Sequence, residues 1–221
     1  GFNQMVEGLR ERQRLADLFG RHVGPEVARH ALERGAELVG EQRVLTALFV
    51  DLIGSTTLAE ERPAAEVVAV LNALFDAVVE AVVAEGGWVN KFEGDGAVCV
   101  FGALVDQPDH AARALRAARS LHAAITERAQ SDDALDAAVG VSTGAAVAGN
   151  IGAVERFEYT VIGDAVNEAS RLSEVAKNHR GRVLASEAAV EAAAGQAGEW
   201  VFDAEVTLRG RRRPTRSYRP D

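Results

Sequence analysis

Apolar positions along the chain change from one spacing to another, and this change predicts a domain built from both strands and helices. The run 44–50 is almost entirely apolar, which is typical of a buried central strand. A Gly-Ser-Thr turn follows, and then an apolar stretch over 64–85 in which Asn72, Asp76 and Glu80 recur every four positions. That spacing predicts a long helix with one polar stripe on an otherwise buried surface.

Further changes of pattern complete the predicted domain. We expect a hairpin over 88–101, a helix over 109–128, a strand over 135–143 and an irregular glycine-rich arm over 144–155. A strand over 157–162 and a helix over 164–177 follow, and the remaining residues form short strands and a helix. Strands that are joined both by hairpins and by helices indicate the α+β fold class. The predicted architecture is a ferredoxin-like, mixed and mostly antiparallel sheet with flanking helices.

The N-terminal part is predicted to be a separate helical segment, so we divide the chain into a linker over 1–42 and a main domain over 43–221. Coiled-coil spacing, in steps of three and four with one polar interruption, joins Phe2, Met5, Leu9, Arg12, Ala16, Phe19 and Val23. Pro25 suits the first turn of a second short helix that would end near Gly35. Its apolar face would consist of Val27, Ala28, Ala31 and Leu32. Either an appendage packed on the main domain or a signal-relaying linker fits this pattern, and we favour the linker because the chain begins inside a repeat.

Composition limits the possible functions. Of the 221 residues, 48% are hydrophobic and 26% charged, which is typical of a soluble globular protein. The formal net charge of −9 argues against nonspecific nucleic-acid binding, although arginines crowd the C-terminal stretch. Cys99 is the only cysteine, which excludes an intrachain disulfide, and we expect a buried, inert thiol. We expect no membrane span, because polar residues interrupt even the most apolar helix, and we expect no signal peptide.

Two aspartates are the first candidates for chemistry. Asp51 ends the apolar run 44–50, and Asp95 lies near the tip of the predicted hairpin. Each has a common structural explanation, because Asp often caps helices or forms turns, and Asp-Gly is a frequent hairpin signal. Two strands that each deliver an acid to one sheet edge, with glycines around them, nevertheless favour a divalent-cation site facing phosphates. Lys91, four residues before Asp95, adds a cation close to this edge.

Two further groups of residues suit phosphate chemistry. Ile53, Gly54, Ser55 and Thr56 would place backbone amides at the start of the next helix, where a phosphate can bind. Asn167 and Arg171 are four residues apart and share one face of the predicted helix 164–177. They suit either an ordinary solvent-exposed face or the stabilisation of charge on a phosphoryl group, and periodicity alone does not choose between these.

Three strings together resemble the catalytic domain of class III adenylate and guanylate cyclases. They are Phe49-Val-Asp-Leu-Ile-Gly-Ser-Thr56, Asn90-Lys-Phe-Glu-Gly-Asp-Gly96 and Tyr159-Thr-Val-Ile-Gly-Asp-Ala-Val-Asn-Glu-Ala-Ser-Arg-Leu172. They follow the order and spacing of the family over roughly 43–218. The segment 19–27 is similar to the helices before many bacterial cyclase domains, and 2–12 is similar to the end of a HAMP signalling module. The resemblance implies a membrane sensor upstream and a catalytic domain at the cytoplasmic face of the membrane, of which this fragment is a soluble part.

The resemblance also implies roles for single residues. Asp51 and Asp95 would bind two Mg²⁺ or Mn²⁺ ions, Asn167 would orient the ribose, and Arg171 would meet the charge on the transferring phosphoryl group. Arg209 matches a basic position that contacts the terminal phosphates. The reaction implied is the conversion of ATP into 3′,5′-cyclic AMP and pyrophosphate.

Base choice depends on two positions in the family. Adenylate cyclases pair a lysine with aspartate or threonine, whereas guanylate cyclases carry glutamate and cysteine, and this chain has Lys91 and Thr160. Lysine donates to N1 of adenine but accepts nothing from guanine, so ATP is favoured, with some turnover of GTP left open by Thr160.

The family site is shared between two chains of a head-to-tail dimer, so we expect a homodimer with two equivalent sites. The alternatives are a guanylate cyclase, an inactive cyclase-like module that binds nucleotide or only dimerises, and a polymerase-like enzyme. The acidic balance and the Asn167/Arg171 pair oppose the polymerase.

Overall fold

The computed structural model describes residues 2–24, 27–29, 40–130, 135–153, 155–211 and 213–221. Within these residues, eight strands form one sheet in the order β2-β3-β1-β4-β6-β8-β7, and β5 pairs with β4 beside that path. The strands are β1 (Gly40–Leu52), β2 (Trp88–Glu93), β3 (Gly96–Phe101), β4 (Ala137–Ala153), β5 (Arg156–Gly163), β6 (Val183–Ser186), β7 (Trp200–Val206) and β8 (Thr215–Pro220). The helices are α1 (Phe2–Val23), α3 (Ser55–Glu61), α4 (Ala64–Ala84), α5 (His110–Arg128), α6 (Asp164–Ala176) and α7 (Glu187–Ala193).

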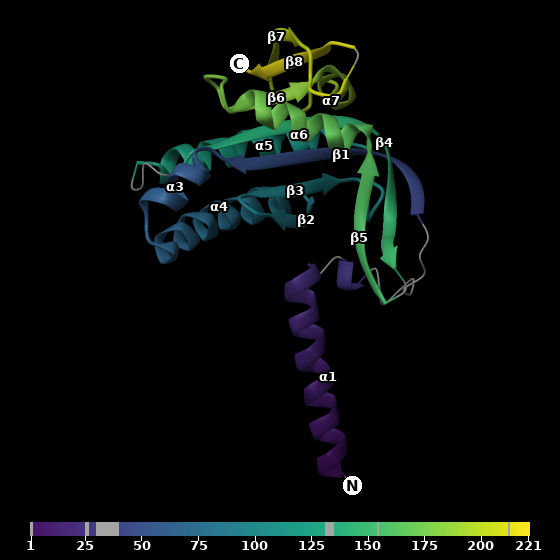
Figure 1. The fold of residues 1–221 in the computed structure, drawn as a ribbon. Helices are drawn as coiled ribbons and strands as arrows, with labels where there is room; N and C mark the ends of the chain where they lie inside the picture. The colour runs from purple at the N-terminus through teal and green to yellow at the C-terminus, as the bar shows by residue number, and fades with distance from the viewer. Residues whose placement is uncertain (1, 25–26, 30–39, 131–134, 154, 212) are drawn as a thin grey trace.

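The sheet is centred on β1, which pairs antiparallel with both β3 and β4. The order β2-β3-β1-β4, with α4 after β1 and α5 after β3, is the ferredoxin-like arrangement. The β4–β6 pair is parallel, and the other pairs in the sheet are antiparallel. The predicted α+β class with a mixed, mostly antiparallel sheet and flanking helices is therefore confirmed (Figure 1).

Alternation along the strands assigns the helices to opposite faces of the sheet. Leu48 and Val50 of β1 and Val139 of β4 belong to the main core, together with the buried residues of α4 and α5. Gly140 points to the other face, where a Cβ atom would lie 2.1 Å from the Ala169 carbonyl oxygen of α6. The missing side chain at Gly140 therefore lets α6, the helix with the Asn167 motif, pack directly against β4.

The prediction of an irregular arm over 144–155 was wrong for residues 144–153. Strand β4 continues to Ala153, because its backbone pairs with β1 as far as Gly149 on one side and with β5 on the other. Glycines at these positions indicate close backbone approach rather than a loop, since the Ala165 Cβ atom would lie 3.3 Å from a Cβ at Gly144. The β4–β5 pair forms a long ribbon that extends beyond the helical layers (Figure 1).

The N-terminal segment contains the predicted helix α1, which extends away from the sheet domain (Figure 1). Of the predicted coiled-coil positions only Leu9 has a described side chain, and it is 58% exposed. Residues 27–29 are helical, whereas Pro25 and the positions from Ala31 to Gly35 lie outside the described residues. Val27 is buried against a cluster that includes Leu45 of β1, so this part of the segment packs on the main domain. The division at 42/43 stays a prediction, and β1 begins at Gly40.

Helix α4 departs from the expected surface. Asn72, Asp76 and Glu80 are exposed as predicted, but so are Val68 and Val83. By length and composition alone α4 would pass as a membrane span, contrary to our expectation, although its buried residues are part of the sheet core. Cys99 of β3 is fully buried, and burial strongly raises the pKa of its thiol, as expected for an inert cysteine.

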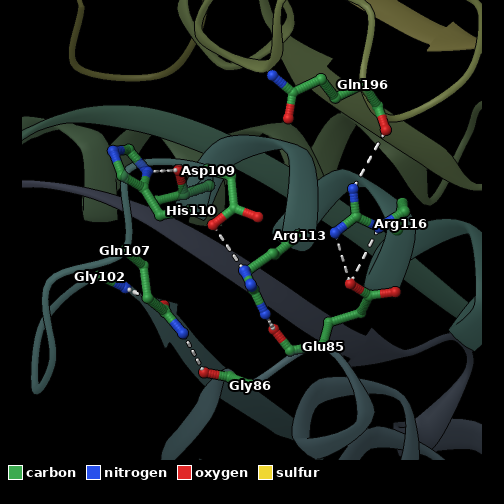
Figure 2. Close-up of polar contacts among 10 residues, drawn as sticks. Glu85, Gly86, Gly102, Gln107, Asp109, His110, Arg113, Arg116 and Gln196 are labelled. Atoms are coloured by element: carbon green, nitrogen blue, oxygen red, sulfur yellow. Dashed lines mark hydrogen bonds and ion pairs between the residues drawn. The ribbon is translucent and has the colours of Figure 1, made fainter.

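Polar contacts tie the loop before α5 to the end of α4 (Figure 2). Gln107 accepts from the Gly102 amide at 2.9 Å and donates to the Gly86 carbonyl at 2.8 Å. Arg116 of α5 binds the Glu85 carboxylate at 2.8 Å and also donates to the Gln196 carbonyl. These bonds hold α4 and α5 together on the face of the sheet where both helices pack against β1 and β3.

Candidate active site

The two predicted metal ligands lie in one cleft. Asp51 is near the end of β1, opposite Gly96 of β3, and Asp95 is in the two-residue turn between β2 and β3. The Leu52 amide donates to the Asp95 carbonyl at 3.0 Å, which joins the turn to β1. A Cβ atom at Gly96 would lie 2.6 Å from the Val50 carbonyl oxygen, so glycine is required for this close approach.

The cleft has a volume of about 170 Å³ and is rich in carboxylates. Its lining includes Asp51, Asp95 and Glu93, together with Ser170, Ser173 and Glu174 of α6. Carboxylates gathered around one small space create a negative potential that attracts divalent cations. The acidic edge of the sheet thus faces the C-terminal half of α6.

Asp51 is paired with a lysine that follows α6. The Lys177 ammonium binds the Asp51 Oδ2 atom, and both side chains are mostly buried. Burial raises the pKa of Asp51 above its usual value of 3.8, Asp95 and Glu174 raise it further, and the hydrogen bond from Lys177 lowers it. Lys177 therefore supplies a positive charge beside the carboxylate that is predicted to bind a metal ion.

The donor set of the cleft fits a hard divalent cation. Carboxylate oxygens are the ligands that Mg²⁺ and Mn²⁺ prefer. Among the described residues, no group of three or more His, Cys, Asp or Glu side chains is arranged to hold a metal by itself. Asp51 and Asp95 would therefore hold ions whose remaining ligands come from water and from the phosphates of a nucleotide.

The residues predicted to read the base lie on β2 and β5. Thr160 is connected to β2 through Asn90, whose Oδ1 atom accepts from the Thr160 hydroxyl at 3.0 Å. Lys91, the residue after Asn90, forms an ion pair of 2.8 Å with Glu93. The Trp88 and Tyr159 rings, 5.6 Å apart, also pack β2 against β5. The fold thus connects the two strands that carry the predicted base-reading residues, although β2 and β5 are not paired in the sheet.

Asn167 and Arg171 do not line the acidic cleft of their own chain. Asn167 is exposed, and the Arg171 guanidinium binds Glu174 one turn further along α6. The sheet-facing side of α6 carries Ala165, Ala169 and Leu172 instead. Within a single chain, Asn167 and Arg171 are therefore outside the cleft lining, although Arg171 binds Glu174, which is part of that lining.

The C-terminal loop that carries Arg209 is anchored to α6. Arg209 itself is exposed. Two residues later, Arg211 binds Asp164 at 2.8 Å and Glu168 at 2.5 Å. Glu168 is buried and also accepts from the Ser142 hydroxyl at 2.6 Å and the Thr215 hydroxyl at 2.8 Å.

The predicted phosphate amides are at the start of the short helix α3. Gly54 has φ of +74°, a left-handed conformation that glycine adopts readily, and its carbonyl accepts from the Leu58 amide. Ser55 and Thr56 form the first turn of α3. The Ile53 amide is already used, since it donates to the Asp136 carbonyl at 2.8 Å.

A larger cavity, of about 310 Å³, lies near the other end of β1. Its lining includes Arg43, Val44, Gln107 and His110, and it contains none of the predicted site residues. Volume alone would favour this cavity as the active site, but the paired carboxylates favour the smaller cleft.

Sequence reasoning missed four residues of the site. Glu93 and Glu174 line the cleft, Lys177 binds Asp51, and Asn90 binds Thr160. Asn90 and Glu93 lie inside a recognised string, so their position was a usable signal. No signal in the sequence indicated Glu174 and Lys177, because their positions at the cleft depend on where α6 packs.

Relatives of known sequence match the whole chain. Two uncharacterized proteins of Mycobacterium tuberculosis are each 48% identical over 222 residues, which is 100% of this chain. The chain spans 38% and 40% of the length of these relatives.

Solved structures with the same fold include enzymes for both purine nucleotides. The adenylyl cyclase CyaB from P. aeruginosa has a TM-score of 0.75 at 28% identity, over 82% of this chain and 95% of that chain. The guanylyl cyclase Cya2 has a TM-score of 0.72 at 31% identity, over 81% and 92%. A model of the adenylate and guanylate cyclase catalytic domain matches residues 39–218. The chain therefore belongs to the family of adenylate and guanylate cyclase catalytic domains.

Proposed function

We propose that the chain is an adenylate cyclase domain that converts ATP into 3′,5′-cyclic AMP and pyrophosphate at the interface of a head-to-tail homodimer. The observation that carries this proposal is the convergence of Asp51 and Asp95 in one acidic cleft. Family membership supplies the reaction class, and the cleft supplies the chemistry that this class needs. Because both acids are present, an inactive cyclase-like module is the weaker alternative.

The reaction is an in-line displacement at phosphorus. The ribose 3′-oxygen bonds to the α-phosphorus while the bond from this phosphorus to the bridging oxygen of the β-phosphate breaks. Pyrophosphate leaves with the bonding electrons, and the 3′-hydroxyl proton passes to solvent. Two Mg²⁺ or Mn²⁺ ions, held by Asp51 and Asp95, would favour loss of that proton and neutralise the triphosphate.

The chain's own side chains would position the substrate. Asn167 orients the ribose, and Arg171 offers a guanidinium fork to the charge that grows on the α-phosphoryl group. Arg209 and the amides at the start of α3 bind the outer phosphates. In this chain Arg171 and Lys91 instead bind Glu174 and Glu93, so these ion pairs open when the nucleotide enters.

Adenine is the favoured base. Lys91 donates to N1 of adenine, and the Thr160 oxygen, on β5, is joined to β2 by its bond to Asn90. Guanylate cyclase activity is the second candidate, and its support is the likeness to the guanylyl cyclase Cya2, which is as close as the likeness to CyaB. Lys91 opposes guanine, because an ammonium cannot accept from the guanine N1–H group.

The upstream context extends the proposal to the whole protein. The similarity of 2–12 to the end of a HAMP module supports a place for this domain behind a membrane sensor, at the cytoplasmic face. The greater length of the relatives leaves room for such a sensor. Fractionation of the full-length protein would test this, and recovery in the soluble fraction alone would contradict it.

Incubation with ATP, and separately with GTP, tests the catalytic proposal in the presence of Mn²⁺. We expect cyclic AMP from ATP, and we expect Asp51→Ala to lower the rate by about 100-fold or more, because metal binding supplies several kcal/mol of transition-state stabilisation. Asp109→Ala is the matched control, since Asp109 is also an aspartate in an ion pair but lies outside the cleft. Absence of cyclic product at high protein concentration would favour the inactive module, and equal losses in the two variants would contradict the role of Asp51.

A further inference from the structure

The hydrogen bonds around Thr160 determine where its hydroxyl proton points. The Asn90 Nδ2 atom donates to the Tyr159 carbonyl oxygen at 3.0 Å. A carbonyl oxygen only accepts, so this bond turns the other end of the amide, Oδ1, toward Thr160. The Thr160 hydroxyl then donates to Asn90 Oδ1 at 3.0 Å. Both bonds are partly buried and lie between strands β2 and β5, which limits competition from water.

A hydroxyl group has one proton and two acceptor lone pairs. Because its proton is used by Asn90, Thr160 can offer a ligand only an acceptor. Lys91, the residue after Asn90, can offer only donors. If Thr160 and Lys91 read the base together, their acceptor and donor match adenine, which has an amino donor at position 6 and an acceptor at N1. Guanine has an oxygen acceptor at position 6 and a donor at N1, so in the same place it meets the opposite pattern at both atoms.

We propose that Asn90 determines base specificity by holding the Thr160 hydroxyl as an acceptor, so that the site selects a 6-aminopurine nucleotide over a 6-oxopurine nucleotide. This inference rests on the proposed function, because it takes Lys91 and Thr160 as the residues that read the base. Asn90 itself does not touch the base and acts through Thr160. We therefore expect Asn90 to affect the ratio of kcat/KM for the two nucleotides, and not the rate with both of them.

The variant Asn90→Ala tests the inference. Without the amide, the hydroxyl can rotate and donate to O6 of GTP as readily as it accepts from the amino group of ATP. We expect the ratio of kcat/KM for ATP to that for GTP to fall about tenfold, the effect of one hydrogen bond of about 1.4 kcal/mol. Asn72→Ala, which removes an exposed asparagine of α4, is the matched control and should leave the ratio unchanged.

A rescue variant separates this role from a merely structural one. In the Asn90→Ala background, Thr160→Asp supplies a carboxylate, which accepts but has no proton to donate at neutral pH. We expect this double variant to regain the preference for ATP. An unchanged ratio in Asn90→Ala, or equal losses with both nucleotides and no rescue, would overturn the inference.

Binding measurements separate failure of the inference from failure of the proposed function. If the wild-type chain makes no cyclic product, calorimetric titration with non-cyclisable ATP and GTP analogues in the presence of Ca²⁺ still reports base preference. A ratio of dissociation constants that shifts toward GTP in Asn90→Ala then supports the inference while the catalytic proposal fails. Equal affinity of the wild-type chain for both analogues, or no affinity for either, would overturn it.

Discussion

His110, at the start of α5, is a half-buried histidine (Figure 2). Its Nδ1 atom lies 2.7 Å from the Thr46 hydroxyl, which in turn lies 2.7 Å from the Thr143 hydroxyl. Burial lowers the pKa of His110 below its usual value of 6.5, although Asp109 and Asp106 oppose the shift. The folded state therefore favours the neutral imidazole in a network that holds β1, β4 and α5 together.

The lowered pKa of His110 predicts a loss of stability in mild acid. As the pH falls through 6.5, the unfolded chain binds a proton more readily than the folded one, so the stabilisation present above 6.5 is lost below it. Burial lowers the pKa of His122 as well, so its effect has the same sign. We expect His110→Asn to lose less stability between pH 7.5 and 5.5 than the wild type, and His110→Asn/His122→Asn to lose least, measured by urea unfolding. Equal losses in all three proteins would contradict this prediction.

Single residues also show what local sequence can predict. The end of the apolar run 44–50 and the glycines near Asp95 placed both acids correctly at one sheet edge. Lys177 could not be predicted as the partner of Asp51, because that contact depends on how α6 packs over β4. Asn90 was visible in the sequence, but its bond to Thr160 depends on the approach of β2 to β5.

At the scale of elements, the least predictable part was the second half of β4, because the first half lies within the predicted strand 135–143. Glycines and alanines over 144–153 give no alternation of apolar and polar residues, because this stretch is paired by β1 and β5 and touched closely by α6. The helices were predicted well, since α4, α5 and α6 each carry a strong apolar face. The local pattern of side chains does not predict such a strand, because its conformation depends on the strands and the helix around it.

The anchoring of the C-terminal loop to α6 predicts an indirect role for Arg211. Its bonds to Asp164 and the buried Glu168 hold the loop in which Arg209 is exposed. We expect Arg211→Ala to raise KM for ATP by about tenfold with a smaller change in kcat, since a charged hydrogen bond contributes about 1.5–3 kcal/mol. Steady-state kinetics at saturating Mn²⁺ would measure both constants.

A double-variant comparison tests whether Arg211 acts through Arg209. If it does, Arg211→Ala should add little to the KM of Arg209→Ala, because the group being positioned is already gone. Arg216→Ala is the matched control, since this arginine of β8 binds Glu187 instead. Additive effects of Arg211 and Arg209, or an equal effect of Arg216→Ala, would show that the ion pair serves stability alone.

At the scale of the whole molecule, a single chain does not bring all of the predicted site residues into one cleft. Asp51 and Asp95 line the cleft, whereas Asn167 and Arg171 are not among the residues that line it. In a head-to-tail dimer each half would face the complementary half of the other chain, and a two-fold axis would generate two equivalent sites. The specific activity should therefore rise with protein concentration as dimers form, and a constant specific activity on dilution would contradict shared sites.

Mixing two inactive variants provides the sharper test of a shared site. In a random mixture of Asp51→Ala and Asn167→Ala, half of the dimers combine the two chains, and each of these has one intact site and one site with both defects. The mixture should regain about one quarter of the wild-type activity. Asp51→Ala mixed with Asp95→Ala is the control, because both changes affect the same half and no combination restores an intact site. No recovery in the first mixture, despite dimers detected by light scattering, would place all catalytic groups within a single chain. Recovery in the control would instead assign Asp51 and Asp95 to different halves of the site.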